Sequence, residues 1–357
     1  MTRFKTISIL ALLAVIATAT IGVMFLLSED LSQKHNSFTR RFIHRATLER
    51  DADLKFNTYF FAGEHNGNLY LGSTSVPLYV NLYDSLLQKQ ATNRISLERS
   101  DFAFRSINLI VQPPDFYFTD GTVPCIFSGK IKDWKAGLKY NGSTWFNNPQ
   151  VMDSSTIAFR TRDAQGYSAI GIMPQLGGKA VIGEGILQKQ VDGVFDADGT
   201  LLYDMPTDKL VYLYRYRNQY IVMDNTGKVE KRATTIDTIS KAQIEVTQIT
   251  DRNQQKMSKP PLVVNKGNAI YKNLLFVNAA LVGRNEAKEM WGMASIIDVY
   301  DMSEESYITS FYVYDIGGKK IRSFIVRNNK LYALIGTHLV SYTLDAGIVK
   351  NYKDTIH

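Results

Sequence analysis

The sequence predicts an all-β domain assembled from several small antiparallel sheets. Short apolar runs alternate with turns rich in Gly, Asn, Asp and Pro through most of the 357 residues. The same strand–turn–strand order returns along the chain at a recurring interval. Beyond the N-terminal region, no long segment shows the apolar spacing of an amphipathic helix.

The clearest copy of this repeat lies between Lys320 and Leu344, where polar residues at 327–330 and 336–338 separate three apolar strands. The residues that begin equivalent strands in the six copies are Leu69, Phe116, Tyr167, Leu210, Leu274 and Leu331. Their spacing of 43 to 64 residues is the length of a four-stranded propeller blade. We expect a single β-propeller of about six four-stranded antiparallel blades over residues 57–357. A pair of β-sandwiches or an irregular all-β domain is the alternative.

The two ends of the repeat region indicate how the ring closes. Little chain remains after Leu344 to complete the last blade, whereas a spare strand at Tyr59–Ala62 precedes the first repeat. Pairing the N-terminal strand with the C-terminal blade would remove an exposed sheet edge. We therefore expect Tyr59–Ala62 to be the closing strand. The polar residues 228–266 are interpreted as a long insertion or loop.

The N-terminus has the pattern of a membrane anchor. Residues 7–27 are uncharged and strongly apolar, a length that spans the roughly 30 Å hydrocarbon layer as a helix. Arg3 and Lys5 precede this run and two acidic residues follow it, which favours an N-terminus inside the cell. The alternative is a signal peptide cleaved after the small residues 17–19. We divide the chain into an anchor (1–28), a charged stalk (29–56) and the propeller.

Four arginines, Arg40, Arg41, Arg45 and Arg50, lie close together in the predicted stalk. We interpret this segment as a solvated spacer. The alternative is that these arginines contact lipid headgroups.

The strand steps NLYLG, DFYFTDG and KLYALIG resemble those of six-bladed β-propellers over about residues 57–352. With the N-terminal anchor, the layout is similar to uncharacterised membrane-anchored propeller-like proteins of bacterial envelopes. This resemblance implies an architecture and a single-pass location in the cytoplasmic membrane with the bulk of the chain on the periplasmic side. It implies no catalytic residues.

No assembled catalytic or metal-binding motif is evident in the sequence. The single cysteine, Cys125, lies in an apolar run and is interpreted as a buried hydrophobic residue. Ser168 lacks the spacing of a nucleophile elbow, and 196–199 lacks the later ligands of a calcium loop. His65 and His338 occupy different steps of their repeats. We therefore predict no cofactor and no metal.

The most suggestive local pattern is a tyrosine ladder at Tyr212, Tyr214 and Tyr216. At the two-residue period of a strand these rings share one face, where they could bind sugars or peptides. Packing between blades is the other interpretation of the ladder. The chain carries a net charge of +7, but its charges are scattered and its location is outside the cytoplasm, so we expect no nucleic-acid partner.

Two functions remain open from the sequence. The first is a membrane-anchored binding module for a peptide, a glycan or an envelope protein. The second is a propeller hydrolase or lyase that has carboxylates along its channel and that could depend on calcium. Acids from several blades meeting at one channel mouth would favour the enzyme.

Overall fold

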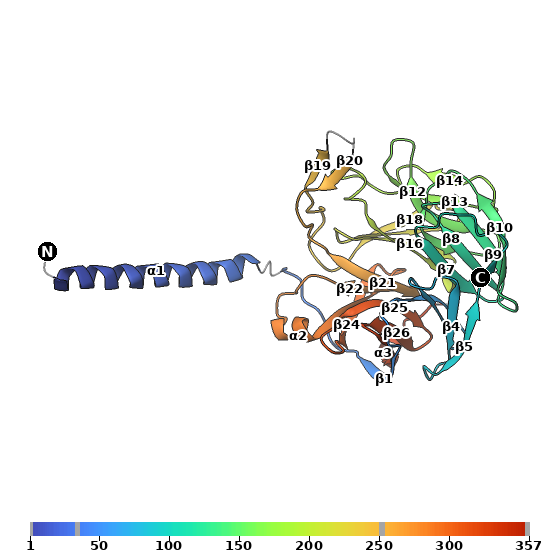
Figure 1. The fold of residues 1–357 in the computed structure, drawn as a ribbon. Coiled ribbons are helices and arrows are strands. Elements are labelled where there is room, and N and C mark those ends of the chain that lie inside the picture. Colours follow the sequence, from blue (N-terminus) through green and yellow to red (C-terminus); the bar gives the residue numbers. More distant parts are fainter. Residues whose placement is uncertain (1–2, 33–35, 250–253, 354–357) are drawn as a thin grey trace.

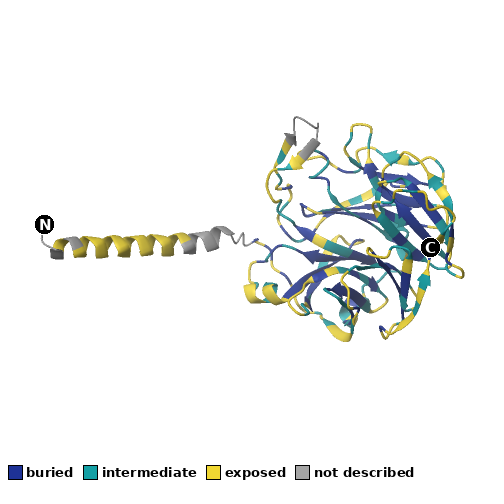
Figure 2. Ribbon diagram, viewed as in Figure 1, coloured by how far each residue is buried: buried dark blue, intermediate teal, exposed yellow. Residues whose placement is uncertain are grey.

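The structure is a computed structural model that describes residues 3–32, 36–249 and 254–353. A long helix, α1 (Arg3–Ser32), precedes a ring of small sheets (Figure 1). Within α1, the window Ile7–Met24 has a mean hydropathy of 2.5, is unburied, and is long and apolar enough to cross a membrane. Figure 2 shows α1 exposed wherever it is described, with the buried residues concentrated in the sheets.

The described residues form a six-bladed β-propeller of antiparallel four-stranded sheets, which confirms the predicted fold class. Each blade runs from a first strand at the central channel to a fourth strand at the rim. The strands of blades 1 to 3 are β2 (Tyr59–His65), β3 (Asn68–Ser73), β4 (Tyr79–Tyr83), β5 (Lys89–Arg94); β7 (Ile107–Gln112), β8 (Asp115–Asp120), β9 (Cys125–Lys130), β10 (Lys135–Asn141); and β11 (Asn147–Val151), β12 (Ile157–Arg162), β13 (Ser168–Met173), β14 (Val181–Gly183).

A short strand, β6 (Ser96–Leu97), adds to blade 2 by pairing parallel with β10. The strands of blades 4 to 6 are β15 (Gly199–Asp204), β16 (Lys209–Tyr214), β17 (Gln219–Met223), β18 (Val229–Thr234); β21 (Asn265–Tyr271), β22 (Leu274–Ala279), β23 (Ala294–Asp301), β24 (Ser306–Tyr314); and β25 (Ile321–Arg327), β26 (Lys330–Ile335), β27 (His338–Leu344), β1 (Ala46–Asp53). The remaining elements are the hairpin β19 (Val246–Ile249) with β20 (Gln254–Met257), the 3-10 turn η1 (Met205–Thr207), and the helices α2 (Lys288–Met293) and α3 (Ala346–Val349).

The ring is closed by an N-terminal strand, but the predicted strand is wrong. The closing strand is β1, which pairs antiparallel with β27 from Ala46 opposite Leu344 to Asp53 opposite His338. Tyr59–Ala62 instead belongs to β2, the first strand of blade 1. The sequence of β1, ATLERDAD, is mostly exposed at the rim, and this polar character led to its interpretation as part of a stalk.

The apolar core lies between the blades. Six clusters of buried side chains each join two neighbouring blades, so the ring is packed all the way round. Because the second strands have a neighbouring blade on both faces, they are buried along nearly their full length in β3, β8, β16, β22 and β26. These are the strands that five of the six predicted repeat starts mark.

The sixth repeat start, Tyr167, is out of register with the others. It directly precedes β13, which is the third strand of blade 3, whereas the second strand of that blade begins at Ile157. In this blade the third strand carries the longest buried run, so its apolar pattern imitated a second strand.

The propeller has two different ends. The turns between first and second strands, at 66–67, 113–114, 152–156, 205–208, 272–273 and 328–329, form what we name the turn face. The connections between blades, together with α2 and the β19–β20 hairpin, lie at the opposite end, which we name the connection face. In Figure 1 the hairpin and α2 lie on the side from which α1 extends.

Candidate functional site

The central channel opens at the turn face into a cavity of about 960 Å³. Its walls are the ends of the first strands of all six blades, β2, β7, β11, β15, β21 and β25, together with the turns that follow them. Because every blade contributes, a ligand in this cavity would be contacted from all sides. A volume of this size is typical of small-molecule and short-peptide sites.

Side-chain amides are the most frequent polar groups of the cavity wall. Five of the six blades contribute them, and they are Asn66, Asn108, Gln112, Asn148, Gln150, Asn268 and Asn328. The amide of Gln112 makes a long contact of 3.8 Å to the sulfur of Met205, and the Gln150 amide donates to the Pro149 carbonyl at 3.0 Å. Within the described chain, neither Gln side-chain carbonyl accepts a hydrogen bond, so both are free to accept one from a ligand.

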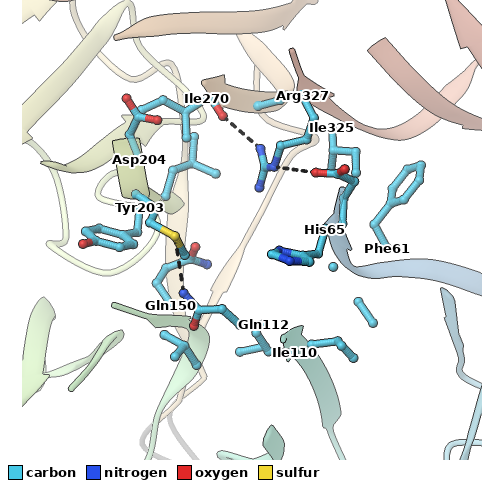
Figure 3. A pocket seen from close by; sticks show the side chains of 18 of the residues that line it. Phe61, His65, Ile110, Gln112, Gln150, Tyr203, Asp204, Ile270, Ile325 and Arg327 are labelled. Atoms are coloured by element: carbon cyan, nitrogen blue, oxygen red, sulfur yellow. Dashed lines mark hydrogen bonds and ion pairs between the residues drawn. The ribbon is translucent and has the colours of Figure 1, made fainter. Parts of the chain in front are cut away.

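Among the described residues, one arginine and no lysine line this cavity. The Arg327 Nε lies 3.6 Å from the Glu64 carboxylate, and its Nη1 donates to the Val326 carbonyl at 2.8 Å. Its Nη2 has no hydrogen-bond partner among the described residues. Figure 3 shows the Arg327 guanidinium and the His65 ring pointing into the cavity toward Gln112 and Gln150. The site therefore presents a guanidinium and an imidazole across from two side-chain amides.

Aromatic and branched apolar side chains fill the wall between these polar groups, including Phe61, Ile110, Ile325, Tyr117 and Tyr203. Burial raises the pKa of Tyr117 to about 12, and nearby carboxylates add to this effect. The Tyr203 hydroxyl, whose pKa is raised by burial and by its 2.7 Å hydrogen bond to Asp208, is also protonated at neutral pH. Both phenols therefore serve as hydrogen-bonding groups and not as bases.

Four carboxylates from four blades line the cavity, the arrangement that would favour an enzyme, yet each has structural partners. Glu64 accepts the Gly67 N–H at 2.8 Å, and Asp115 pairs with Lys130 at 2.7 Å. Asp153 accepts N–H groups of its own turn, which include those of 155 and 156.

The fourth, Asp204, links two blades. It is 1% exposed, and it accepts the backbone N–H groups of Lys272 and Asn273 at 3.0 and 2.7 Å. It also accepts the Thr207 hydroxyl at 2.6 Å. These donors hold the Asp204 carboxylate against the β21–β22 turn of the neighbouring blade and give it a structural role.

The tyrosine ladder lies outside the cavity and is buried in the domain. Tyr212, Tyr214 and Tyr216 are 0, 1 and 7% exposed, in and just after the second strand of blade 4. The Tyr212 hydroxyl donates to the Ala197 carbonyl at 2.6 Å, and the guanidinium of Arg217 lies 3.6 Å from the centre of the Tyr214 ring. This placement agrees with packing between blades and corrects the binding interpretation, because a ligand would have to displace the core.

The other candidate residues are also separated from the cavity, with one exception. Ser168 donates to the Val194 carbonyl, and the fully buried Asp196 accepts several backbone N–H groups of its own loop. His338 pairs with Asp51 at 2.6 Å on the connection face, so it does not meet His65, which does line the cavity. Among the described residues, no three His, Cys, Asp or Glu side chains gather where a metal ion would be held.

Sequence reasoning missed Gln112, Gln150 and Arg327. Each lies at or next to the last residue of a first strand, immediately before a turn. A polar residue at this repeated position was a usable signal. The stronger apolar pattern of the second strands dominates the repeat and masks this signal.

The fold and its channel define the class as a six-bladed β-propeller. No known family model matches the chain, and no curated protein sequence matches it. Among solved structures, a member of the DUF4221 family from Bacteroides vulgatus has 14% identity and a TM-score of 0.53, over 87% of this chain and 99% of that chain.

Two further solved structures are similar at lower TM-scores. A catalytically inactive virginiamycin B lyase from Staphylococcus aureus with quinupristin has 11% identity and a TM-score of 0.48, over 84% of this chain and 100% of that one. BamB from Moraxella catarrhalis has 13% identity and a TM-score of 0.39, over 78% and 80%. At these identities the likeness shows the fold alone.

Proposed function

We propose that this chain is a membrane-anchored, extracytoplasmic binding module that holds a peptide or glycan segment in the channel mouth at the turn face. The observation that carries the proposal is the amide-rich cavity of about 960 Å³. Primary amides both donate and accept hydrogen bonds, so they match peptide groups and sugar hydroxyls alike. A segment of an envelope protein is a ligand of the same chemistry.

The place where the chain enters the propeller supports a site that faces away from the membrane. The described chain resumes after α1 at Asn36, whose side-chain amide donates to the Val282 carbonyl at 3.5 Å. The Phe38 carbonyl accepts the Arg284 N–H at 2.9 Å. Both contacts are with residues 280–287, which belong to the connection face. A membrane that holds α1 would then lie on the connection side, and the cavity would open toward the extracytoplasmic space.

Binding can be tested with the full chain in detergent or nanodiscs. Glycan and peptide arrays, and crosslinking pull-downs from envelope fractions, should identify a ligand. Its binding should be saturable and should be blocked by an excess of the same unlabelled ligand. The double variant Gln112→Ala with Gln150→Ala should weaken binding of that ligand by roughly 5- to 30-fold, the effect of about 1–2 kcal/mol of lost hydrogen bonding. A matched double variant at exposed amides outside the cavity, Gln88→Ala with Gln165→Ala, should bind like wild type. Equal affinity for all three proteins would contradict the assignment of the site.

The alternative, a hydrolase or lyase, is favoured by the four carboxylates that reach the cavity. Their engagement with backbone, lysine and arginine partners supports binding over turnover. An ester, lactone, phosphate and glycoside panel, run with and without calcium, tests it directly. Reproducible turnover that disappears in Glu64→Gln or Asp153→Asn would replace the binding proposal.

A further inference from the structure

The chain between α1 and the propeller is short. The apolar run ends at residue 27, and α1 continues to Ser32, which adds only about 7–8 Å of helix. From Ser32 to the packed Asn36, four residue steps span at most roughly 14 Å. If α1 crosses a membrane, the surface around Asn36 lies at most about 22 Å from the edge of the hydrocarbon layer, close enough for neighbouring parts of the propeller to reach the headgroups.

An exposed aromatic patch lies beside this entry point, on blade 5. The Phe42 ring stacks on Tyr312 with centroids 4.5 Å apart, and the Tyr312 ring lies 6.3 Å from Tyr314. The Met293 carbonyl accepts the Asp315 N–H at 2.9 Å, which places Met293 beside the end of β24. Phe42, Met293 and Tyr314 are 37, 52 and 54% exposed. We name Phe42, Met293, Tyr312 and Tyr314 the blade-5 patch.

Both cations and acids lie on the segments next to this patch, and one of the cations, Lys320, pairs with Asp315 at 3.3 Å. Arg284 and Lys288 are exposed on the loop and helix that lead to Met293. Lys320 donates to the Trp291 carbonyl at 2.7 Å, and the Lys266 ammonium lies 5.7 Å from the centre of the Trp291 ring. Glu289 is an exposed acid on the same helix, α2. Aromatic side chains with a polar tip, flanked by lysine and arginine, have the composition of a membrane–water interface.

The patch adjoins a segment that is held rigidly. The Arg40 side chain is 1% exposed and bonds both Glu286 and Asp298 at 2.7–3.0 Å. Phe42 is two residues further along the same segment. Motion of α1 therefore cannot move the blade-5 patch independently of the propeller.

From this arrangement we propose that the blade-5 patch lies on the lipid surface, with its aromatic rings at the headgroup–acyl boundary and its cations on anionic headgroups. The inference rests on the proposed anchoring by α1. Two features favour a lipid surface over a protein partner. The chain between α1 and the propeller is short, which keeps the patch near the membrane, and exposed cations lie on the neighbouring segments. This contact holds the propeller in one orientation and keeps the channel mouth pointing away from the bilayer.

The test places an environment-sensitive fluorophore on the full chain in nanodiscs that contain lipid-borne quenchers. The label is attached at Met293→Cys, and the control label at Leu86→Cys, which is equally apolar, 50% exposed and on the turn face. The native Cys125 is fully buried and does not compete for the label. We expect a several-fold greater loss of fluorescence at 293 than at 86, and a larger difference with phosphatidylglycerol than with phosphatidylcholine alone.

Charge reversal provides a second measurement. Arg284→Glu with Lys288→Glu should reduce quenching at 293 toward the level at 86, whereas the exposed turn-face control Lys132→Glu should leave it unchanged. Equal quenching at 293 and 86, in chains that remain with the disc, would refute the lipid contact and leave the anchor intact. Protection of the 293 label from aqueous quenchers without lipid quenching would assign the patch to a protein partner. Chains that separate from the discs would overturn both the anchor and the patch.

Discussion

Replacing Arg40 by methionine removes the centre of a buried charge network. Its Nε and Nη2 donate to Asp298 at 2.7 and 3.0 Å, and its Nη1 donates to Glu286 at 2.8 Å and to the Leu281 carbonyl at 3.0 Å. Burial alone would lower the pKa of Arg40, but attraction to Asp298 and Glu286 outweighs it and raises that pKa above its ordinary value. The guanidinium is therefore charged at every accessible pH.

The expected loss in the free energy of unfolding follows from the two carboxylates that Arg40→Met leaves without their partner. Removing one member of a buried ion pair costs about 3–5 kcal/mol, because the remaining charge is neither solvated nor paired. Here Asp298 keeps a hydrogen bond from the Ser310 hydroxyl, and Glu286 keeps one from the Trp291 indole at 2.7 Å. These remaining donors favour the lower end, about 3 kcal/mol, which corresponds to a Tm lower by roughly 6 °C in a domain of this size.

The assay is thermal unfolding of the full chain in detergent, followed by the β-sheet circular dichroism signal. Arg50→Met on the exposed strand β1 is the matched control and should change Tm by no more than about 1 °C. Arg40→Lys should fall between wild type and Arg40→Met, because an ammonium keeps the charge but cannot bond both carboxylates in the same geometry. If Arg40→Met unfolds with the Tm of Arg50→Met, the network does not stabilise the fold and the argument is wrong.

Three further predictions concern ring closure, acid and the thiol. Deleting all residues after Gly336 removes β27, the strand that β1 and β26 both pair with, so circular dichroism and melting should show an unfolded domain; a native melt would contradict closure by the chain ends. Burial raises the pKa of Asp120, but the backbone N–H groups that donate to it at 2.8–3.0 Å outweigh burial and lower that pKa in the folded chain. The Asp120 carboxylate therefore stabilises the fold fully above its unfolded pKa of about 3.9, and this stabilisation is lost as the pH falls through its lower folded pKa. Asp120→Asn should therefore lower Tm at pH 7 and reduce the further drop in Tm on acidification to pH 3, whereas an unchanged drop would refute its role. Burial raises the pKa of the Cys125 thiol to about 11, so a disulfide reagent should modify it only as fast as the chain unfolds, and rapid labelling of native protein would show that the site is open.

The strands that pack on both faces were visible in the sequence because their whole length is apolar. Five of the six repeat starts, from Leu69 to Leu331, mark second strands, and they predicted a ring of about six blades without any knowledge of pairing. The N-terminal apolar helix was equally evident, since its length and hydropathy are local properties. Local pattern therefore determined the fold class and the helix that could cross a membrane.

The tertiary structure decided the features that depend on distant partners. The polar strand β1 becomes part of a sheet only because β27 offers it a free edge, and Arg40 is buried only because Asp298 and Glu286 meet it there. The same holds for the channel mouth, where the ends of six first strands converge although their own sequences alternate between polar and apolar. Strand pairing, ion pairing and cavity lining join residues far apart in the chain, so a one-dimensional pattern fixes which segments form strands but not which side chains those strands bring together.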